Sequence, residues 1–244
     1  MGYFFVNSLV VMGALATPVL ATECNLALVL ALDVSGSVDA NEDRLQREGV
    51  ANAILARVVK AAFLERAPVA LFVFEWSTPS HQEPLLPGWK IVESEQDLVE
   101  VAEEIRVSRR GGDTQLNPTT AVGSALGFAA AALRDGPRCD AATIDISADG
   151  KNNQGLGPSA AYAAYPLDGV IVNALVVDAA DEPRPSWEDG NVLGWYEAEV
   201  VRGPGAFAIV ANGYDDYARA MELKLLRELE LPVIGGSIGR GGAS

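Results

Sequence analysis

Short, continuously apolar segments alternate along this chain with segments whose apolar residues recur at helical spacing. The apolar segments are typical of parallel strands buried on both faces and cover residues 26–32, 69–74, 142–147, 170–177 and 206–210, with an edge strand predicted at 89–92. Helical spacing or a capping signal predicts helices at 42–64, 94–107, 120–133 and 217–229. This alternation predicts an α/β fold with a doubly wound, mostly parallel sheet and helices on both faces. The loop-rich segment 178–194 receives no assignment.

The two ends of the chain depart from this pattern. Residues 1–21 contain no Asp, Glu, Lys or Arg and end in small residues at Ala21, which indicates a cleaved signal peptide. An uncleaved leader that anchors the chain in a membrane is the less favoured alternative. Residues 233–244 are Gly-rich and are expected to form a flexible tail. We therefore expect one domain over 22–232, in a periplasmic or secreted protein with no stable membrane span after cleavage.

Charge and residue counts exclude several classes of function. The chain has 33 acidic and 18 basic residues and a formal net charge of −15, so a nucleic-acid partner is excluded because phosphate neutralisation needs a basic face. His81 is the sole histidine. A Ser-His-Asp hydrolase in the α/β-hydrolase order therefore has no suitably placed base. A catalytic zinc site, which normally draws on His or Cys, is also not expected.

The strongest chemical signal follows the first predicted strand, at Asp33, Ser35 and Ser37. Ligands of open α/β sheets bind outside the carboxyl ends of the strands, where the strand order reverses, and the first strand normally lies at that reversal. One carboxylate and two hydroxyls that alternate along an extended turn can converge on one point. Such oxygen ligands suit Mg²⁺. The alternative is that this segment only caps a helix.

Three separate segments together resemble von Willebrand factor A domains: D-V-S-G-S from Asp33, T-A-V-G-S-A-L from Thr120, and S-A-D-G around Asp149. The resemblance implies a metal-ion-dependent adhesion site, with Mg²⁺ or alternatively Mn²⁺ or Ca²⁺, whose ligand shells contain Asp33, Ser35, Ser37, Thr120 and Asp149. The extra residues 113–118 leave Thr114 and Thr119 as alternatives to Thr120. The spacing from Thr120 to the following Ala-Leu pair favours Thr120.

Further segments resemble a narrower group, the exported bacterial domain-of-unknown-function family 1194. They include C-N-L-A-L-V-L-A-L-D-V-S-G-S-V-D from Cys24, F-E-W-S around Glu75, and I-D-I-S-A-D-G-K-N-N. The resemblance covers nearly all of 24–230. Glu75 and Trp76 end the second predicted strand at the rim of the proposed metal site, so they are expected to shape a partner-binding surface. Core packing is the alternative for Trp76.

The two cysteines are expected to form a disulfide. Cys24 lies nine residues before Asp33, and Cys139 lies ten residues before Asp149. In the fold that the resemblance implies, the two strands are parallel neighbours, so nearly equal offsets bring the cysteines together at the opposite edge. An oxidising compartment would preserve such a bond.

The resemblance implies binding rather than catalysis. A cation held mainly by hydroxyls keeps a strong positive charge, and an open coordination position then attracts an external carboxylate. We expect an Asp or Glu of an unidentified protein partner to fill it. The alternatives are a Mg²⁺-dependent phosphatase-like enzyme and a scaffold with a vestigial metal site. Asp145, in the middle of a predicted strand, is expected to be a buried structural acid.

Overall fold

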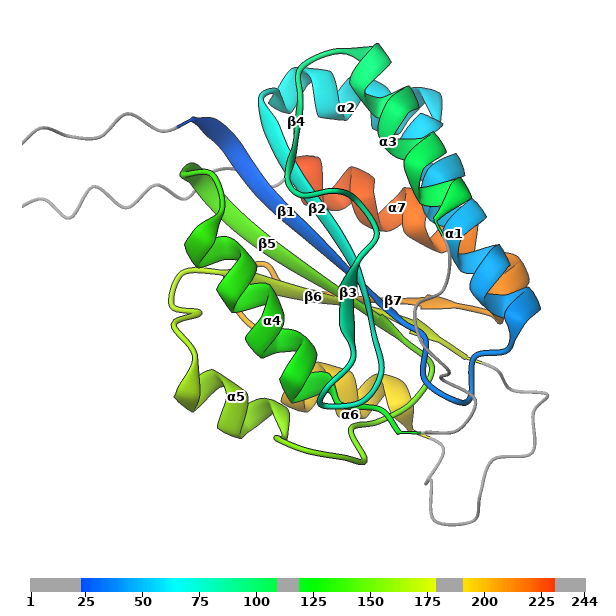
Figure 1. The fold of residues 1–244 in the computed structure, drawn as a ribbon, viewed down its shortest axis with the longest axis vertical. Helices are drawn as coiled ribbons and strands as arrows, with labels where there is room; N and C mark the ends of the chain where they lie inside the picture. The colour runs from blue at the N-terminus through cyan, green and yellow to red at the C-terminus, as the bar shows by residue number, and fades with distance from the viewer. Residues whose placement is uncertain (1–22, 109–118, 179–190, 231–244) are drawn as a thin grey trace, which may run out of the picture.

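The computed structural model describes residues 23–108, 119–178 and 191–230, and the predicted leader and tail lie outside these ranges. Its centre is a seven-stranded sheet in the order β3-β2-β1-β5-β6-β7, with β4 also paired to β2 (Figure 1). The strands are β1 (Cys24–Asp33), β2 (Val69–Trp76), β3 (Gln82–Pro84), β4 (Lys90–Val92), β5 (Cys139–Ala148), β6 (Ile171–Val177) and β7 (Ala208–Ala211). The helices are α1 (Ala40–Leu55), α2 (Arg57–Arg66), α3 (Glu95–Val107), α4 (Val122–Asp135), α5 (Pro158–Ala164), α6 (Val192–Glu199) and α7 (Tyr217–Glu230).

The predicted fold class is confirmed. Strands β2, β1, β5, β6 and β7 run parallel, whereas the short β3 and β4 pair antiparallel with β2 at one edge. The chain passes from β1 to β2 on one side and later returns to β5 on the other side, so the strand order reverses at β1. The loop after β1 therefore lies where ligands of this class of sheet bind.

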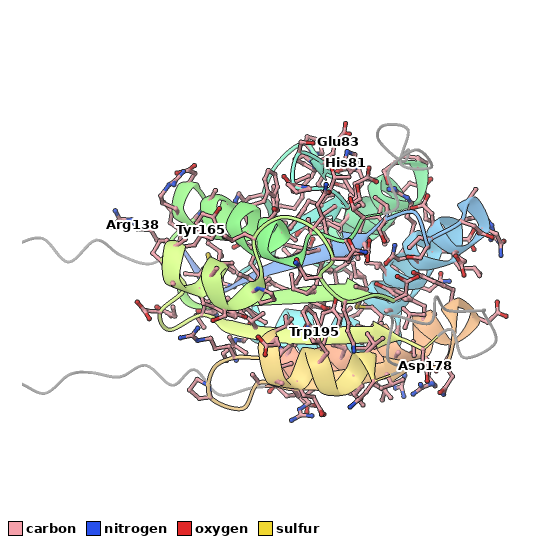
Figure 2. All side chains as sticks on the ribbon, turned by 90° about the horizontal axis from the view of Figure 1, so that it is seen from below. His81, Glu83, Arg138, Tyr165, Asp178 and Trp195 are labelled. Carbon is pink, nitrogen blue, oxygen red and sulfur yellow. A yellow bond between two sulfur atoms is a disulfide. The ribbon has the colours of Figure 1, made fainter. Side chains whose placement is uncertain are left out.

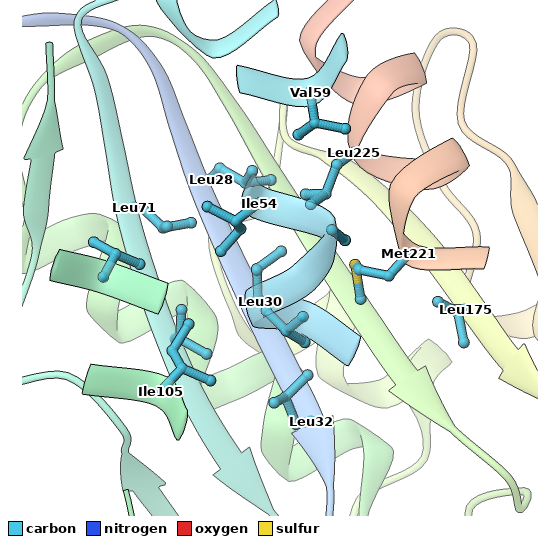
Figure 3. Close-up of a cluster of buried hydrophobic side chains, with 14 of the residues drawn as sticks. Leu28, Leu30, Leu32, Ile54, Val59, Leu71, Ile105, Leu175, Met221 and Leu225 are labelled. Atoms are coloured by element: carbon cyan, nitrogen blue, oxygen red, sulfur yellow. The ribbon is translucent and has the colours of Figure 1, made fainter. Parts of the chain in front are cut away.

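Two helical layers cover the sheet. Helices α1, α2, α3 and α7 lie on one face, and α4, α5 and α6 lie on the other (Figure 1). The side chains of β1 alternate between the two layers, with Leu28 and Leu30 in one core cluster and Val29 in the other. Figure 3 shows the first cluster, in which the β1 leucines face Ile54 of α1 and Met221 of α7. This double burial explains why β1 is apolar throughout.

The structure differs from the sequence prediction in four places, the first of which is helix α5, a short helix that no pattern in the sequence predicted. The predicted helix 42–64 is two helices, because Ala56 adopts φ −58° and ψ 135° and ends α1. The apolar spacing continues on both sides of Ala56, so the pattern did not reveal the break. Strand β3 lies in a segment with several prolines for which no strand was predicted, and it can form there because an edge strand tolerates the missing N–H of Pro84. Helix α6 occupies part of the unassigned segment 178–194, of which 179–190 lie outside the described ranges.

The predicted disulfide is confirmed. Cys24 and Cys139 are bonded, with their Cα atoms 4.4 Å apart, and they are register partners at the start of β1 and β5. The bond thus joins two parallel neighbours at the edge opposite the loops that follow Asp33 and Ala148. Across the described ranges, the helices fall short of the length and apolarity needed to cross a membrane.

Candidate metal centre

The loop after β1 is held in a defined turn. Asp33, the last residue of β1, is fully buried, and its Oδ1 accepts a hydrogen bond from the Ser35 backbone N–H at 2.7 Å. The Val34 N–H donates to the Trp76 carbonyl at 2.8 Å, which ties the loop to the end of β2. Gln46 of α1 donates from Nε2 to the Asp33 carbonyl at 2.9 Å. These bonds fix the backbone from which the Asp33 and Ser35 side chains project.

Three loops meet at the carboxyl ends of β1 and β5. The Ser35 and Ser37 hydroxyls lie 3.2 Å apart. The Ser37 hydroxyl donates to Asp149 Oδ1 at 2.8 Å, and the Thr120 hydroxyl donates to Ser35 Oγ at 3.3 Å. The structure thus brings the five residues predicted for the metal site into one continuous network, although they come from segments far apart in the sequence. This set, called the rim network, consists of Asp33, Ser35, Ser37, Thr120 and Asp149.

Thr120, rather than Thr119, faces this network. Asn153 accepts the Thr120 backbone N–H on its Oδ1 at 2.8 Å, and the Asn153 N–H donates back to the Thr120 carbonyl at 2.9 Å. The neighbouring Thr119 hydroxyl donates instead to Gln154 Oε1 at 2.6 Å. The remaining alternative, Thr114, lies outside the described residues. The loop after β5 therefore positions both Asp149 and, through Asn153, Thr120.

A buried tyrosine that no sequence motif indicated supports the same loop. The Tyr196 hydroxyl of α6 donates to the Gly150 carbonyl at 3.0 Å. Burial, together with the charges of Asp33 and Asp149, raises the pKa of Tyr196 well above its ordinary value, so the phenol stays protonated and remains a donor. Tyr196 follows the unassigned segment, and nothing in the local pattern distinguishes it from a core aromatic residue.

The donor set fits a hard divalent cation. It consists of two carboxylates and three hydroxyls, all oxygen, which is the ligand chemistry of Mg²⁺, Mn²⁺ and Ca²⁺. Burial is graded across the network: Asp33, Ser35 and Thr120 are buried, Asp149 is half-buried and Ser37 is exposed. An ion bound here would thus be enclosed on one side and open to solvent on the other.

The expectation for Glu75 and Trp76 is corrected by their burial. Both side chains are 0% exposed. Trp76 packs in the core cluster beneath α4, which was the alternative interpretation. Glu75 lies on the opposite face of β2 and forms an ion pair with Arg47 at 2.5 Å and a contact with His81 at 3.1 Å. Neither side chain presents an accessible surface to a partner, because strand alternation directs them into the two helical layers.

Asp145 is the buried structural acid that its mid-strand position predicted. It is 1% exposed and forms an ion pair with Lys224 of α7 at 3.1 Å, and Lys224 also contacts Glu228. Burial raises the pKa of Asp145 to about 7, against the opposing charge of Lys224. Asp145 therefore anchors α7 to the sheet and takes no part in the rim network.

Solved structures with a similar fold include several von Willebrand factor A proteins. Proximal thread matrix protein 1 from the mussel byssus, with a zinc-occupied MIDAS motif, superimposes with a TM-score of 0.57 at 17% identity, covering 86% of this chain and 49% of that one. The pilus adhesin SpaC from Lactobacillus rhamnosus GG gives 0.59 at 12% identity, over 84% of this chain and 30% of that one. A von Willebrand factor type A protein from Catenulispora acidiphila gives 0.57 at 13% identity, over 84% and 42%.

This chain thus spans about half or less of the length of those three proteins. At such low identity the likeness concerns the fold, which is that of a von Willebrand factor A domain. No curated protein matches the sequence. The family described as "Protein of unknown function (DUF1194)" matches residues 23–233, which is most of the chain. The resemblance noted in the sequence is therefore confirmed, and the chain belongs to the DUF1194 family.

Proposed function

We propose that this protein is an exported binding module in which a divalent cation captures an acidic group of a protein partner. The cation would be held by Asp33, Ser35, Ser37, Thr120 and Asp149. The observation that carries the proposal is the hydrogen-bonded convergence of three loops, each bearing oxygen ligands, at the point where the strand order reverses.

The graded burial supports capture of an external ligand. Mg²⁺ demands near-octahedral coordination and usually keeps several waters. The buried side, with Asp33 and Thr120, supplies protein ligands, whereas the exposed side near Ser37 leaves positions for water or a partner. A carboxylate is the group expected to displace such a water, because it matches the ion in charge and hardness. Asp or Glu of a protein partner would supply it.

The choice of metal is part of the proposal. The all-oxygen ligand set favours Mg²⁺, with Mn²⁺ and Ca²⁺ as substitutes. The MIDAS motif of the mussel byssus protein is occupied by zinc, so Zn²⁺ belongs among the ions to be compared. The disulfide between Cys24 and Cys139 supports function in an oxidising compartment, the periplasm or the exterior.

A peptide-selection experiment tests the proposal directly. Random peptides selected on the protein in Mg²⁺ should share an essential Asp or Glu, and replacing that residue by Asn or Gln should abolish binding. Chelation with EDTA should also release the peptides. Thr120→Ala should lose peptide binding, whereas Thr119→Ala, a matched change at the neighbouring hydroxyl that bonds Gln154, should retain it. Acid-independent or EDTA-resistant binding would contradict the proposal.

A further inference from the structure

We propose that the hairpin formed by β2 and β3 carries a second divalent-metal site, made by Glu75, His81 and Glu83, that binds Zn²⁺. This site is separate from the oxygen-only rim network and does not depend on the function proposed above. It lies on a different strand pair and combines one imidazole nitrogen with two carboxylates.

Strand pairing brings the three side chains together. Glu75 and Glu83 are register partners in the antiparallel β2–β3 pair, so their side chains lie on the same face of the sheet. His81 lies in the turn between them, and its Nε2 is 3.1 Å from Glu75 Oε1. One ligand atom from each residue lies within 4.8 Å of the other two. Figure 2 shows His81 and Glu83 close together at this edge.

The turn that carries His81 is itself fixed by backbone bonds. The Ser77 N–H donates to the His81 carbonyl at 3.1 Å, and the His81 N–H donates to the Thr78 carbonyl at 3.2 Å. Ligand atoms around a tetrahedral Zn²⁺ lie about 3.3 Å apart, given its bond lengths of roughly 2.0–2.1 Å. The ligand atoms of the three residues lie within 4.8 Å of one another, somewhat farther apart than around a bound Zn²⁺. Glu83 is exposed, so a change of rotamer can bring its carboxylate closer to the other two ligands.

Glu75 is oriented as a metal ligand would be. It is fully buried, and its Oε2 is held at 2.5 Å by Arg47 Nη2. Arg47 is fixed in turn by Asp43 at 3.0 Å and by the Ser108 hydroxyl at 2.6 Å. This leaves Glu75 Oε1 directed at His81. Hydrogen bonds of this kind, behind a ligating carboxylate, fix its orientation and are a regular part of metal sites.

Electrostatics also favours a cation here. Glu75 and Glu83 lie directly opposite each other across the antiparallel pair, and Arg47 balances the Glu75 charge only at Oε2. A divalent ion between Glu75 Oε1 and the Glu83 carboxylate would balance the second negative charge. An N/O ligand set suits Zn²⁺ better than Mg²⁺, which prefers oxygen alone. The half-buried His81 and exposed Glu83 leave an entry path and a position for water. The low count of His and Cys, which made a catalytic zinc site unexpected, does not exclude this site, because two of its three ligands are carboxylates.

The single histidine makes the test specific. Full-length protein without a polyhistidine tag is titrated with Zn²⁺ while the imidazole resonances of His81 are followed by NMR. The His81 signals should shift on saturation with Zn²⁺ and not with Mg²⁺. Glu83→Gln should weaken this Zn²⁺ affinity by at least about 10-fold. Glu197→Gln, the same change at an exposed position of α6, should leave it unchanged.

Zn²⁺ bound at the rim network must be distinguished from Zn²⁺ bound at the hairpin. Asp149→Asn removes a rim carboxylate but should leave the His81 shift and its affinity intact. A His81 resonance that does not respond to Zn²⁺, or an affinity that is unchanged in Glu83→Gln, overturns the proposal. So does a His81 response that disappears in Asp149→Asn, because the ion would then belong to the rim.

Discussion

Ser37 donates a hydrogen bond to Asp149 at 2.8 Å, although 112 positions of sequence separate the two residues. The bond links the loop after β1 to the loop after β5 on the solvent side of the rim network. Because β1 and β5 are parallel neighbours, the two loops leave the sheet at the same edge. The bond thus closes the network into a single site whose carboxylates and hydroxyls face one another.

Replacing Asp149 by Asn should weaken Mg²⁺ binding while the fold is retained. The amide keeps an oxygen that can accept the Ser37 hydroxyl, but it removes one of the two charges in the network. We expect an affinity at least roughly 10-fold lower, as is typical when a metal site loses a supporting interaction. Isothermal titration calorimetry with Mg²⁺ and Mn²⁺ measures this change, and circular dichroism checks the fold.

The same preparation separates binding from catalysis. Generic phosphate esters supplied with Mg²⁺ should not be turned over by the wild-type protein. If turnover is found and Asp33→Ala abolishes it, a phosphatase-like enzyme replaces the binding module. If the wild-type protein shows no binding heat with any of these ions, the network is a structural scaffold without a functional metal.

Removing the Tyr196 hydroxyl should lower the metal affinity of the rim network as well as the stability of the fold. Tyr196→Phe deletes the bond to the Gly150 carbonyl next to Asp149, which should cost about 1 kcal/mol of unfolding free energy and lower Mg²⁺ affinity several-fold. Tyr162→Phe is the matched control, because Tyr162 also donates to a backbone carbonyl, that of Val200, away from the rim. Equal metal affinities in the two variants, measured by calorimetry, would show that Tyr196 only packs the core.

Loss of the disulfide should lower stability without changing the metal site. Cys24 and Cys139 are separated by 115 positions, and closing so long a loop restricts the unfolded chain strongly. We expect the double Cys→Ser variant to lose about 2–5 kcal/mol of unfolding free energy, measured by urea denaturation. Mg²⁺ affinity should stay within error of wild type, because the bond lies at the opposite edge of the sheet. A large fall in affinity would indicate that the bond also sets the rim geometry.

The titration of Asp145 should lower the unfolding free energy of the protein as pH rises from about 4 to 7. Its pKa is raised from 3.8 to about 7 by burial, so between these values the folded state holds a proton that the unfolded state releases, and the unfolding free energy falls with increasing pH. The groups that face it are Lys224, which opposes the shift, and Glu228, which reinforces it. At about 1.4 kcal/mol per pKa unit, the fall amounts to roughly 4 kcal/mol.

Asp145→Asn tests this contribution. The variant should lose most of the decrease in stability between pH 4 and 7, measured by urea denaturation at a series of pH values. Asp168→Asn, at an exposed position, serves as the control and should retain the wild-type profile. An unchanged profile in Asp145→Asn would mean that another group carries the pH dependence.

Hydrophobic periodicity alone is enough to predict the class of fold and the central strands. Residues 26–32 are apolar at every position because β1 is covered by helices on both faces. Asp33, Ser35 and Ser37 could also be found from the sequence, since a cluster of oxygen ligands directly follows that strand. Nearly equal offsets from Asp33 and Asp149, taken with the fold that the resemblance implies, predicted the disulfide, because parallel neighbours share one register.

Long-range packing set the features that local patterns do not carry. Thr120 rather than Thr119 faces the network because Asn153, 33 positions later, holds its backbone. Tyr196 reaches Gly150 from a helix on the other side of an unassigned segment. Glu75 and His81 meet through the pairing of β2 with a three-residue edge strand in a proline-rich segment. Each of these contacts joins residues whose own neighbours in the sequence give no sign of the partner, so only the folded chain specifies them.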